Sequence, residues 1–84
     1  MAATKGEISR WLDTLYSDES LTHMVVVCDT FDWSDFPVFV SKDQNVHEVV
    51  AFHAAHEMEK VTEVYSRALS KESQLAERRA LHYA

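Results

Sequence analysis

The chain has 84 residues and a formal net charge of −6, with 46% hydrophobic residues, 11% aromatic residues and one residue each of Gly, Pro and Cys. This length predicts a single domain over residues 1–84 with a thin stability margin, and the composition excludes disorder. The lone Cys28 excludes an internal disulfide and favours a reducing compartment, while a single Gly excludes a Walker loop and a dinucleotide-binding motif.

The charge is distributed unevenly along the chain. Residues 1–63 contain twelve acids and four bases, and residues 64–84 contain two acids and four bases. An acidic body argues against general nucleic-acid binding, which needs clustered Lys and Arg, and it suits either a basic protein partner or solubility alone. The charged first twenty residues do not fit a signal peptide, and the apolar run 24–28 is too short to span a bilayer. We therefore expect a cytoplasmic protein that does not bind membranes.

The first helix is predicted over about residues 5–17, with uncertain ends. Thr4 and Glu7 have capping-box spacing, in which each side chain binds a backbone N–H of the first turn. The apolar residues that follow recur on one helical face. They are Ile8, Trp11, Leu12, Leu15 and Tyr16.

Two strands are predicted next. Residues 22–31 have a β-branched centre flanked by turn-forming residues, a pattern that suits a strand covered on both faces. Residues 36–41 form the second strand, and the short connection over residues 32–35 predicts a hairpin. Pro37 has no N–H to donate to a neighbouring strand, so the second strand is an edge strand or has Pro37 at its start.

A long C-terminal helix is predicted after residue 44. Asn45 and Glu48 repeat the capping spacing, no Gly or Pro follows, and residues 70–73 are the one polar patch where the helix could bend or restart. Its apolar residues follow heptad spacing. They are Ala54, Met58, Val61, Tyr65, Ala68 and Leu75. The fold class is therefore α+β, in the order α-β-β-α, with the hairpin packed against an N-terminal and a long C-terminal helix.

This predicted architecture leaves apolar surface to cover. A two-stranded sheet is marginal in water, and the long helix presents more apolar residues than the first helix and the hairpin can bury. We therefore predict a homodimer or higher oligomer with Met58, Val61, Tyr65 and Leu75 at the interface. The alternative is that this stripe is plain core.

Histidines on the long helix are the candidate metal ligands. His53, His56 and Glu57 would share one helical face, and imidazole and carboxylate both bind zinc. Together with Cys28 or Asp29 they could close a site, but their spacing is not that of the HExxH metalloproteases. We predict no metal and no cofactor, with the cluster on a solvated helix face. Cys28 lies in an apolar strand and is predicted to be a buried, unreactive thiol.

The hairpin connection is the candidate contact surface. Three carboxylates alternate with aromatic residues around it, and we predict that its partner-binding residues include two of these aromatics. The predicted residues are Asp29, Asp32, Trp33, Asp35 and Phe36. Exposed aromatics are enriched in binding hot spots, but Asp and Ser also initiate turns, and paired carboxylates could do acid–base chemistry. Without a nucleophile or a phosphate-binding loop, binding is favoured over catalysis.

Three segments of the sequence are similar to a known group of proteins. Residues 26–40, 63–66 and 74–79 resemble small uncharacterised accessory proteins of tailed bacteriophages and related mobile elements. The resemblance implies expression in a bacterial cytoplasm and an accessory role such as blocking a host defence protein, and it assigns no functional residue.

The leading hypothesis is therefore a small acidic protein, not an enzyme, that binds an unidentified host protein stoichiometrically. Inhibition of a host defence system, as by an anti-CRISPR, is one form of that role. Two alternatives stay open. One is a metal- or small-ligand-binding protein that uses the His/Glu cluster, and the other is a purely structural oligomer.

Overall fold

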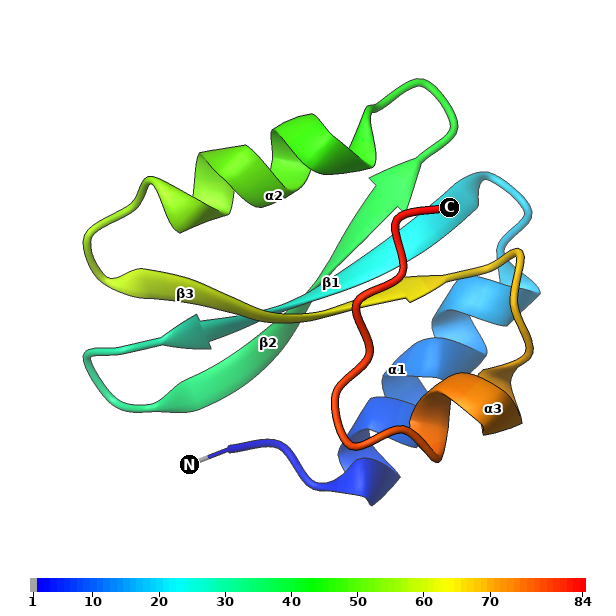
Figure 1. Ribbon diagram of the computed structural model, residues 1–84, viewed down its shortest axis with the longest axis horizontal. Helices are drawn as coiled ribbons and strands as arrows, with labels where there is room; N and C mark the ends of the chain where they lie inside the picture. The colour runs from blue at the N-terminus through cyan, green and yellow to red at the C-terminus, as the bar shows by residue number, and fades with distance from the viewer. Residues whose placement is uncertain (1) are drawn as a thin grey trace.

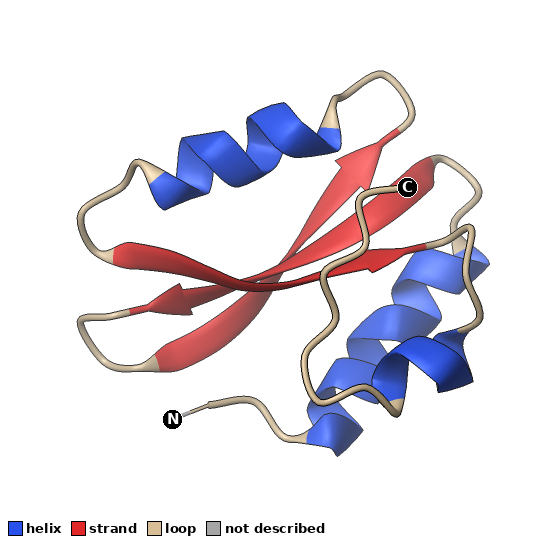
Figure 2. Ribbon diagram, in the orientation of Figure 1, coloured by secondary structure: helices blue, strands red, loops and turns tan. Residues whose placement is uncertain are grey.

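The computed structural model describes residues 2–84, which form three helices and three strands. In chain order these are α1 (Lys5–Ser17), β1 (Leu21–Asp29), β2 (Ser34–Ser41), α2 (Val46–Ala54), β3 (Glu59–Ser66) and α3 (Lys71–Leu75). The strands form one antiparallel sheet in the order β2-β1-β3 (Figure 2). Helix α2 covers one face of the sheet, and α1 and α3 cover the other (Figure 1). The predicted α+β class is confirmed.

Strand β1 lies at the centre of the sheet and is buried on both faces. Successive strand residues point to opposite faces, so Met24 and Val26 join the core under α1, whereas Val25 and Val27 join the core under α2. All four side chains are completely buried. The prediction of a strand covered on both faces is therefore confirmed, and the run of β-branched residues reflects this double burial.

Helix α1 matches its prediction, and strand β2 begins two residues before the predicted start at residue 36. The hydroxyl of Thr4 accepts the N–H of Glu7 at 3.2 Å, and Oε1 of Glu7 accepts the N–H of Thr4 at 3.3 Å, which is the predicted capping box. Leu12 and Leu15 are completely buried beneath the helix. Pro37 lies within β2, opposite Val26, and β2 is an edge strand as the proline requires.

The predicted long C-terminal helix is wrong. Helix α2 ends at Ala54, residues 59–66 form β3 beside β1, and only the short α3 follows. The residues of β3 are rich in β-branched and aromatic side chains, and pairing with β1 satisfies their backbone N–H and C=O groups. Pairing between distant segments therefore overrides the helical propensity of the region.

The apolar stripe assigned to that helix does not exist as one surface. Tyr65 is completely buried in the core under α1, while Val61 packs in the core under α2 and Met58 lies in the loop before β3. Leu75 lies in α3 and packs against the same core as Tyr65. The argument for an oligomer interface on a helical face is thereby removed, and self-association itself stays a prediction.

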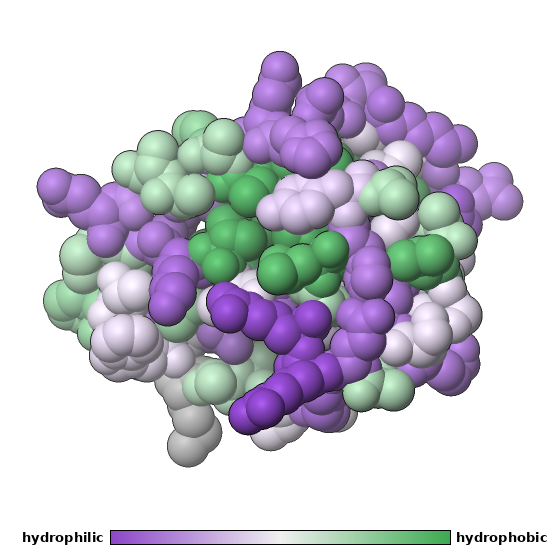
Figure 3. All heavy atoms as spheres, viewed as in Figure 1, coloured by the Kyte–Doolittle hydropathy of each residue, from purple (hydrophilic) through white to green (hydrophobic). Residues whose placement is uncertain are grey.

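The C-terminal segment pairs with the outer edge of β3 at Val64. The N–H of Val64 donates to the carbonyl of Ala80, and the N–H of His82 donates to the carbonyl of Val64, both at 2.9 Å. Farther on, the ring of Tyr83 stacks on His47 with centroids 4.7 Å apart. The segment crosses in front of β3 in Figure 1, and hydrophobic residues gather in the middle of this face in Figure 3. Strand β2 is therefore the edge that the described residues leave open.

None of the helices formed by residues 2–84 has the length and apolar content needed to cross a bilayer.

Candidate functional site

The loop between β1 and β2, residues 30–33, is held in shape by its own side chains. The N–H of Trp33 donates to the carbonyl of Asp29 at 2.7 Å, closing the loop. Oδ1 of Asp29 accepts the N–H of Phe31 at 2.9 Å. Oδ1 of Asp32 accepts the N–H of Ser34 at 3.0 Å and its hydroxyl at 2.7 Å. Two of the predicted partner-binding carboxylates therefore build the turn, which is the structural role weighed for them above.

Trp33 occupies an unusual backbone conformation in this loop. Its φ is 60°, and among the described residues it is the only one that is not Gly and has a positive φ. The left-handed region costs about 1–2 kcal/mol for an L-residue and is normally filled by Gly or Asn. The side chain does not offset this cost by burial, since 62% of Trp33 is exposed, and Phe31 beside it is 80% exposed. The loop thus presents two aromatic rings to solvent.

A second loop, residues 55–58 between α2 and β3, lies against the first. The N–H of Thr30 donates to the carbonyl of Met58 at 2.8 Å, and 47% of Met58 is exposed. Both loops lie at the same end of the sheet, at the left of Figure 1. We call the exposed apolar residues of this end, Phe31, Trp33 and Met58, the aromatic end.

Carboxylates surround the aromatic end. Residues 29–35 contain three acids and no base. The hydrogen bonds from the hydroxyl and backbone of Ser34 hold the pKa of Asp32 below its ordinary value, so this carboxylate stays ionised to a lower pH than an ordinary Asp. Glu57 is exposed in the neighbouring loop. The aromatic rings therefore lie in a negative electrostatic environment.

Asp35 and Phe36 turn away from the loop and pack against the body of the protein. Oδ2 of Asp35 accepts the N–H of Ala3 at 2.9 Å, and the ring of Phe36 meets His53 edge-on with centroids 6.5 Å apart. Cys28 is buried as predicted. Burial, and next its hydrogen bond to Asp35, raise the pKa of the Cys28 thiol. Of the five residues predicted to bind a partner, the structure therefore leaves Trp33 as the exposed apolar one.

The histidine cluster does not form on a helical face, because α2 ends before His56 and Glu57. Nδ1 of His53 lies 2.7 Å from Oε1 of Glu59, and Nδ1 of His56 lies 2.8 Å from the carbonyl of Phe52. The two imidazole rings are 6.2 Å apart. Within residues 2–84, no group of three or more His, Cys, Asp or Glu side chains is placed to hold a metal ion.

Phe31 and Met58 were not among the predicted partner-binding residues of the hairpin, and Met58 was instead predicted to lie in an oligomer interface on the long helix. Phe31 had a visible signal, because an aromatic residue between turn-forming Thr30 and Asp32 has little chance of entering a core. Met58 had none, because its place beside the hairpin depends on the pairing of β3 with β1.

No protein-family model matches the chain, and no curated protein or solved structure matches it either. The resemblance to small phage proteins therefore stays a prediction.

Proposed function

We propose that the protein acts by stoichiometric binding of another protein, without catalysis, and that the aromatic end is its contact surface. The observation that carries this proposal is Trp33, a bulky residue that is strained at a φ of 60° and 62% exposed. Strained residues concentrate at functional sites, and this Trp gives the chain little core packing in return. Contact between Trp33 and a partner protein would account for an exposed Trp at this strained position.

The physical chemistry of the aromatic end suits a protein partner. Exposed Trp is the residue type most enriched in binding hot spots, where its truncation costs at least about 2 kcal/mol. The carboxylates of Asp29 and Asp32 hold the loop in place, so little conformational entropy is lost when a partner binds. Their negative charge would speed association with a basic surface and weaken it at high salt.

The resemblance to phage accessory proteins suggests the setting for this binding. In that setting the partner is a protein of a bacterial host, and blocking a defence protein, as an anti-CRISPR does, is the specific form that we propose. A stoichiometric inhibitor needs a contact surface and no catalytic group, which is consistent with the residues at the aromatic end.

The test compares proteins captured from a bacterial lysate by the wild-type chain and by two variants. Trp33→Gly removes the indole and relieves the backbone strain, so it should keep the fold and lose the partner. Leu69→Ser, which changes an exposed apolar residue away from the aromatic end, is the matched control and should retain the partner. Titration of the purified partner should then show Trp33→Gly binding at least about thirtyfold more weakly, which corresponds to the hot-spot cost. Equal affinity for Trp33→Gly and wild type would contradict the proposal.

A further inference from the structure

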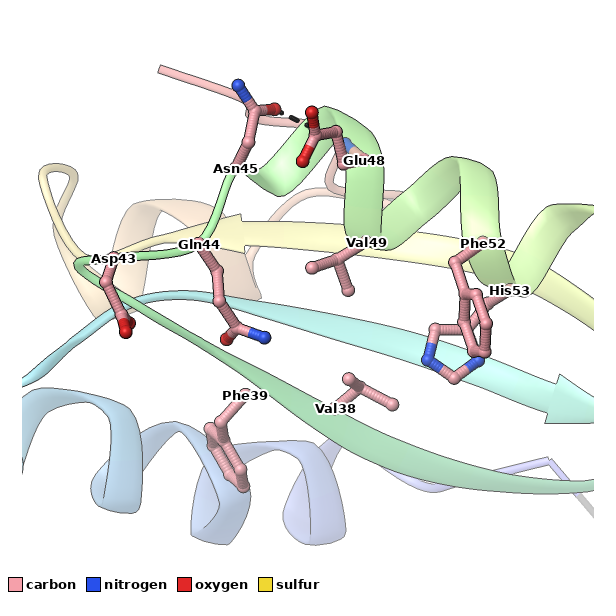
Figure 4. Close-up of a pocket in the computed structure, with 9 residues that line it drawn as sticks. All are labelled: Val38, Phe39, Asp43, Gln44, Asn45, Glu48, Val49, Phe52 and His53. Carbon is pink, nitrogen blue, oxygen red and sulfur yellow. Dashed lines mark hydrogen bonds between the residues drawn. The ribbon is translucent and has the colours of Figure 1, made fainter.

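A groove lies between helix α2 and the edge strand β2, separate from the loops of the aromatic end (Figure 4). Its cavity has a volume of about 410 Å³. Val38 and Phe39 contribute from β2, and Val49 and Phe52 contribute from α2. The loop between these elements closes one end of the groove with Asp43, and Glu48 lines it from the first turn of α2.

The groove reaches the open edge of the sheet. Consecutive strand residues point to opposite faces, and Val38 and Phe39 do so in Figure 4. A cavity that both residues line must therefore touch the outer edge of β2. Backbone groups also alternate along a strand, and the N–H of Ser41 donates to Oε1 of Gln44, outside the sheet, at 3.0 Å. By this alternation the N–H and C=O of Phe39, two residues earlier, face the same open edge.

The chemistry of the groove changes along its length. Val38, Val49 and the largely exposed ring of Phe52 make an apolar wall at one end. Asp43 and Glu48 make the other end acidic, and the described residues that line the groove include no Lys or Arg. The hydroxyl of Ser41 donates a hydrogen bond to Asp43 and lowers the pKa of this carboxyl.

We propose that this groove binds an extended segment of a partner protein, which adds to β2 as an antiparallel strand at Phe39. Both existing pairings of the sheet are antiparallel, and in such a pairing one partner residue exchanges two hydrogen bonds with Phe39. The residues on either side of it then point toward α2. The preceding one lies at the acidic end and is Lys or Arg, and the following one lies against Val49 and Phe52 and is apolar.

Two features define the occupant further. Pro37 has no N–H to donate, so the next outward-facing position offers the added strand its carbonyl alone, and the exchange of two hydrogen bonds is confined to Phe39. A second copy of the chain paired antiparallel at Phe39 would place its Val38, and not a Lys or Arg, at the acidic end of the groove. The groove is a second surface, and its occupancy does not depend on whether the aromatic end binds a partner.

The first experiment titrates the full ¹⁵N-labelled chain with a capped peptide of sequence Thr-Lys-Thr-Val-Thr. We expect the largest amide shifts at Phe39, at Ser41 and along α2. Methylation of the central peptide nitrogen removes the hydrogen bond to the carbonyl of Phe39 and should weaken binding about tenfold. Reversing the order of Lys and Val should also weaken it.

The second experiment exchanges charges. Glu48→Lys should weaken binding of the lysine peptide by about threefold or more and improve binding of the same peptide with Glu in place of Lys. Glu72→Lys makes the same change of charge on α3, across the sheet, and should have no effect. Trp33→Gly should bind the peptide normally, which separates this groove from the aromatic end.

Three results would overturn the proposal. One is the absence of shifts at millimolar peptide, and another is equal binding of the N-methylated peptide. The third is a homodimer in light scattering with the amide of Phe39 protected from hydrogen exchange, because the occupant of the edge would then be a second copy of the chain.

Discussion

Replacing Trp33 by Gly and by Ala separates the strain of the loop backbone from the contribution of the indole. Both variants remove the ring, which is 62% exposed. Ala keeps a Cβ and therefore keeps the cost of the left-handed conformation at φ 60°, whereas Gly adopts that conformation freely. The difference in stability between the two variants thus reports the backbone strain without any contribution from the indole, offset by the greater freedom of Gly in the unfolded chain.

The size of this difference follows from two opposing terms. Relief of the left-handed conformation favours Gly by about 1–2 kcal/mol. The greater freedom of Gly in the unfolded chain favours Ala by about 0.4–1 kcal/mol. We expect the Trp33→Gly variant to be the more stable by about 0.5–1 kcal/mol, the reverse of the usual order inside regular structure. In a domain of this size the melting temperature should then differ by about 2–8 °C.

Urea denaturation followed by far-UV circular dichroism measures the difference, with equal slopes against urea showing that the unfolded states are comparable. Trp33→Asn serves as a control, because Asn tolerates the left-handed region, and it should be at least as stable as Trp33→Ala. If Trp33→Ala equals or exceeds Trp33→Gly in stability, the loop is not strained at this residue. The principal argument for the aromatic end as a contact surface would then be lost.

Three further predictions concern the body of the protein. Gln74→Ala should destabilise the chain by about 2–4 kcal/mol in urea, because the buried amide serves both the N–H and the carbonyl of Ser66. Iodoacetamide should modify Cys28 far more slowly in the folded chain than in urea, since burial raises its pKa, as mass spectrometry would show. Hydrogen bonds from serine lower the pKa values of Asp18 and Asp43 below 3.8. The two carboxylates therefore stabilise the fold above that pH, and this stabilisation is lost as the pH falls through the lowered pKa values. Changing both to Asn should flatten the fall in melting temperature below about pH 4.

The elements that sequence reasoning predicted correctly carry their signals locally. The capping box of Thr4 and Glu7 lies within one helical turn, and the apolar face of α1 repeats within the same segment. The run of β-branched residues in β1 indicates burial on both faces, and this signal does not depend on which strands pair with β1. Pro37 indicated an edge strand because its backbone nitrogen has no hydrogen to donate.

Strand β3 was missed because the evidence for a helix was the absence of Gly and Pro, and that absence does not require a helix. The pairs Val61–Thr62 and Val64–Tyr65 favour a strand, yet helical propensity and heptad spacing fit the same residues. What decides between the two is the unpaired edge of β1, whose residues lie thirty or more positions away in the chain from their partners in β3. The shared helical face expected for the candidate ligands His53, His56 and Glu57 was lost with the long helix, because α2 ends at Ala54.

The composition of the hairpin loop predicted a contact surface, but its shape could not be predicted. That shape depends on the pairing of β3 with β1. Asp29, the last residue of β1, pairs with Ser34 on one side and with Glu59 on the other. One residue therefore fixes both loops of the aromatic end, and the hydrogen bond from Thr30 to Met58 joins them. A loop backbone held by these hydrogen bonds is ordered before binding, so a partner would pay less conformational entropy to fix it. Strand β3, which local sequence signals did not indicate, would thus be the element that gives the exposed hairpin loop a defined shape for binding.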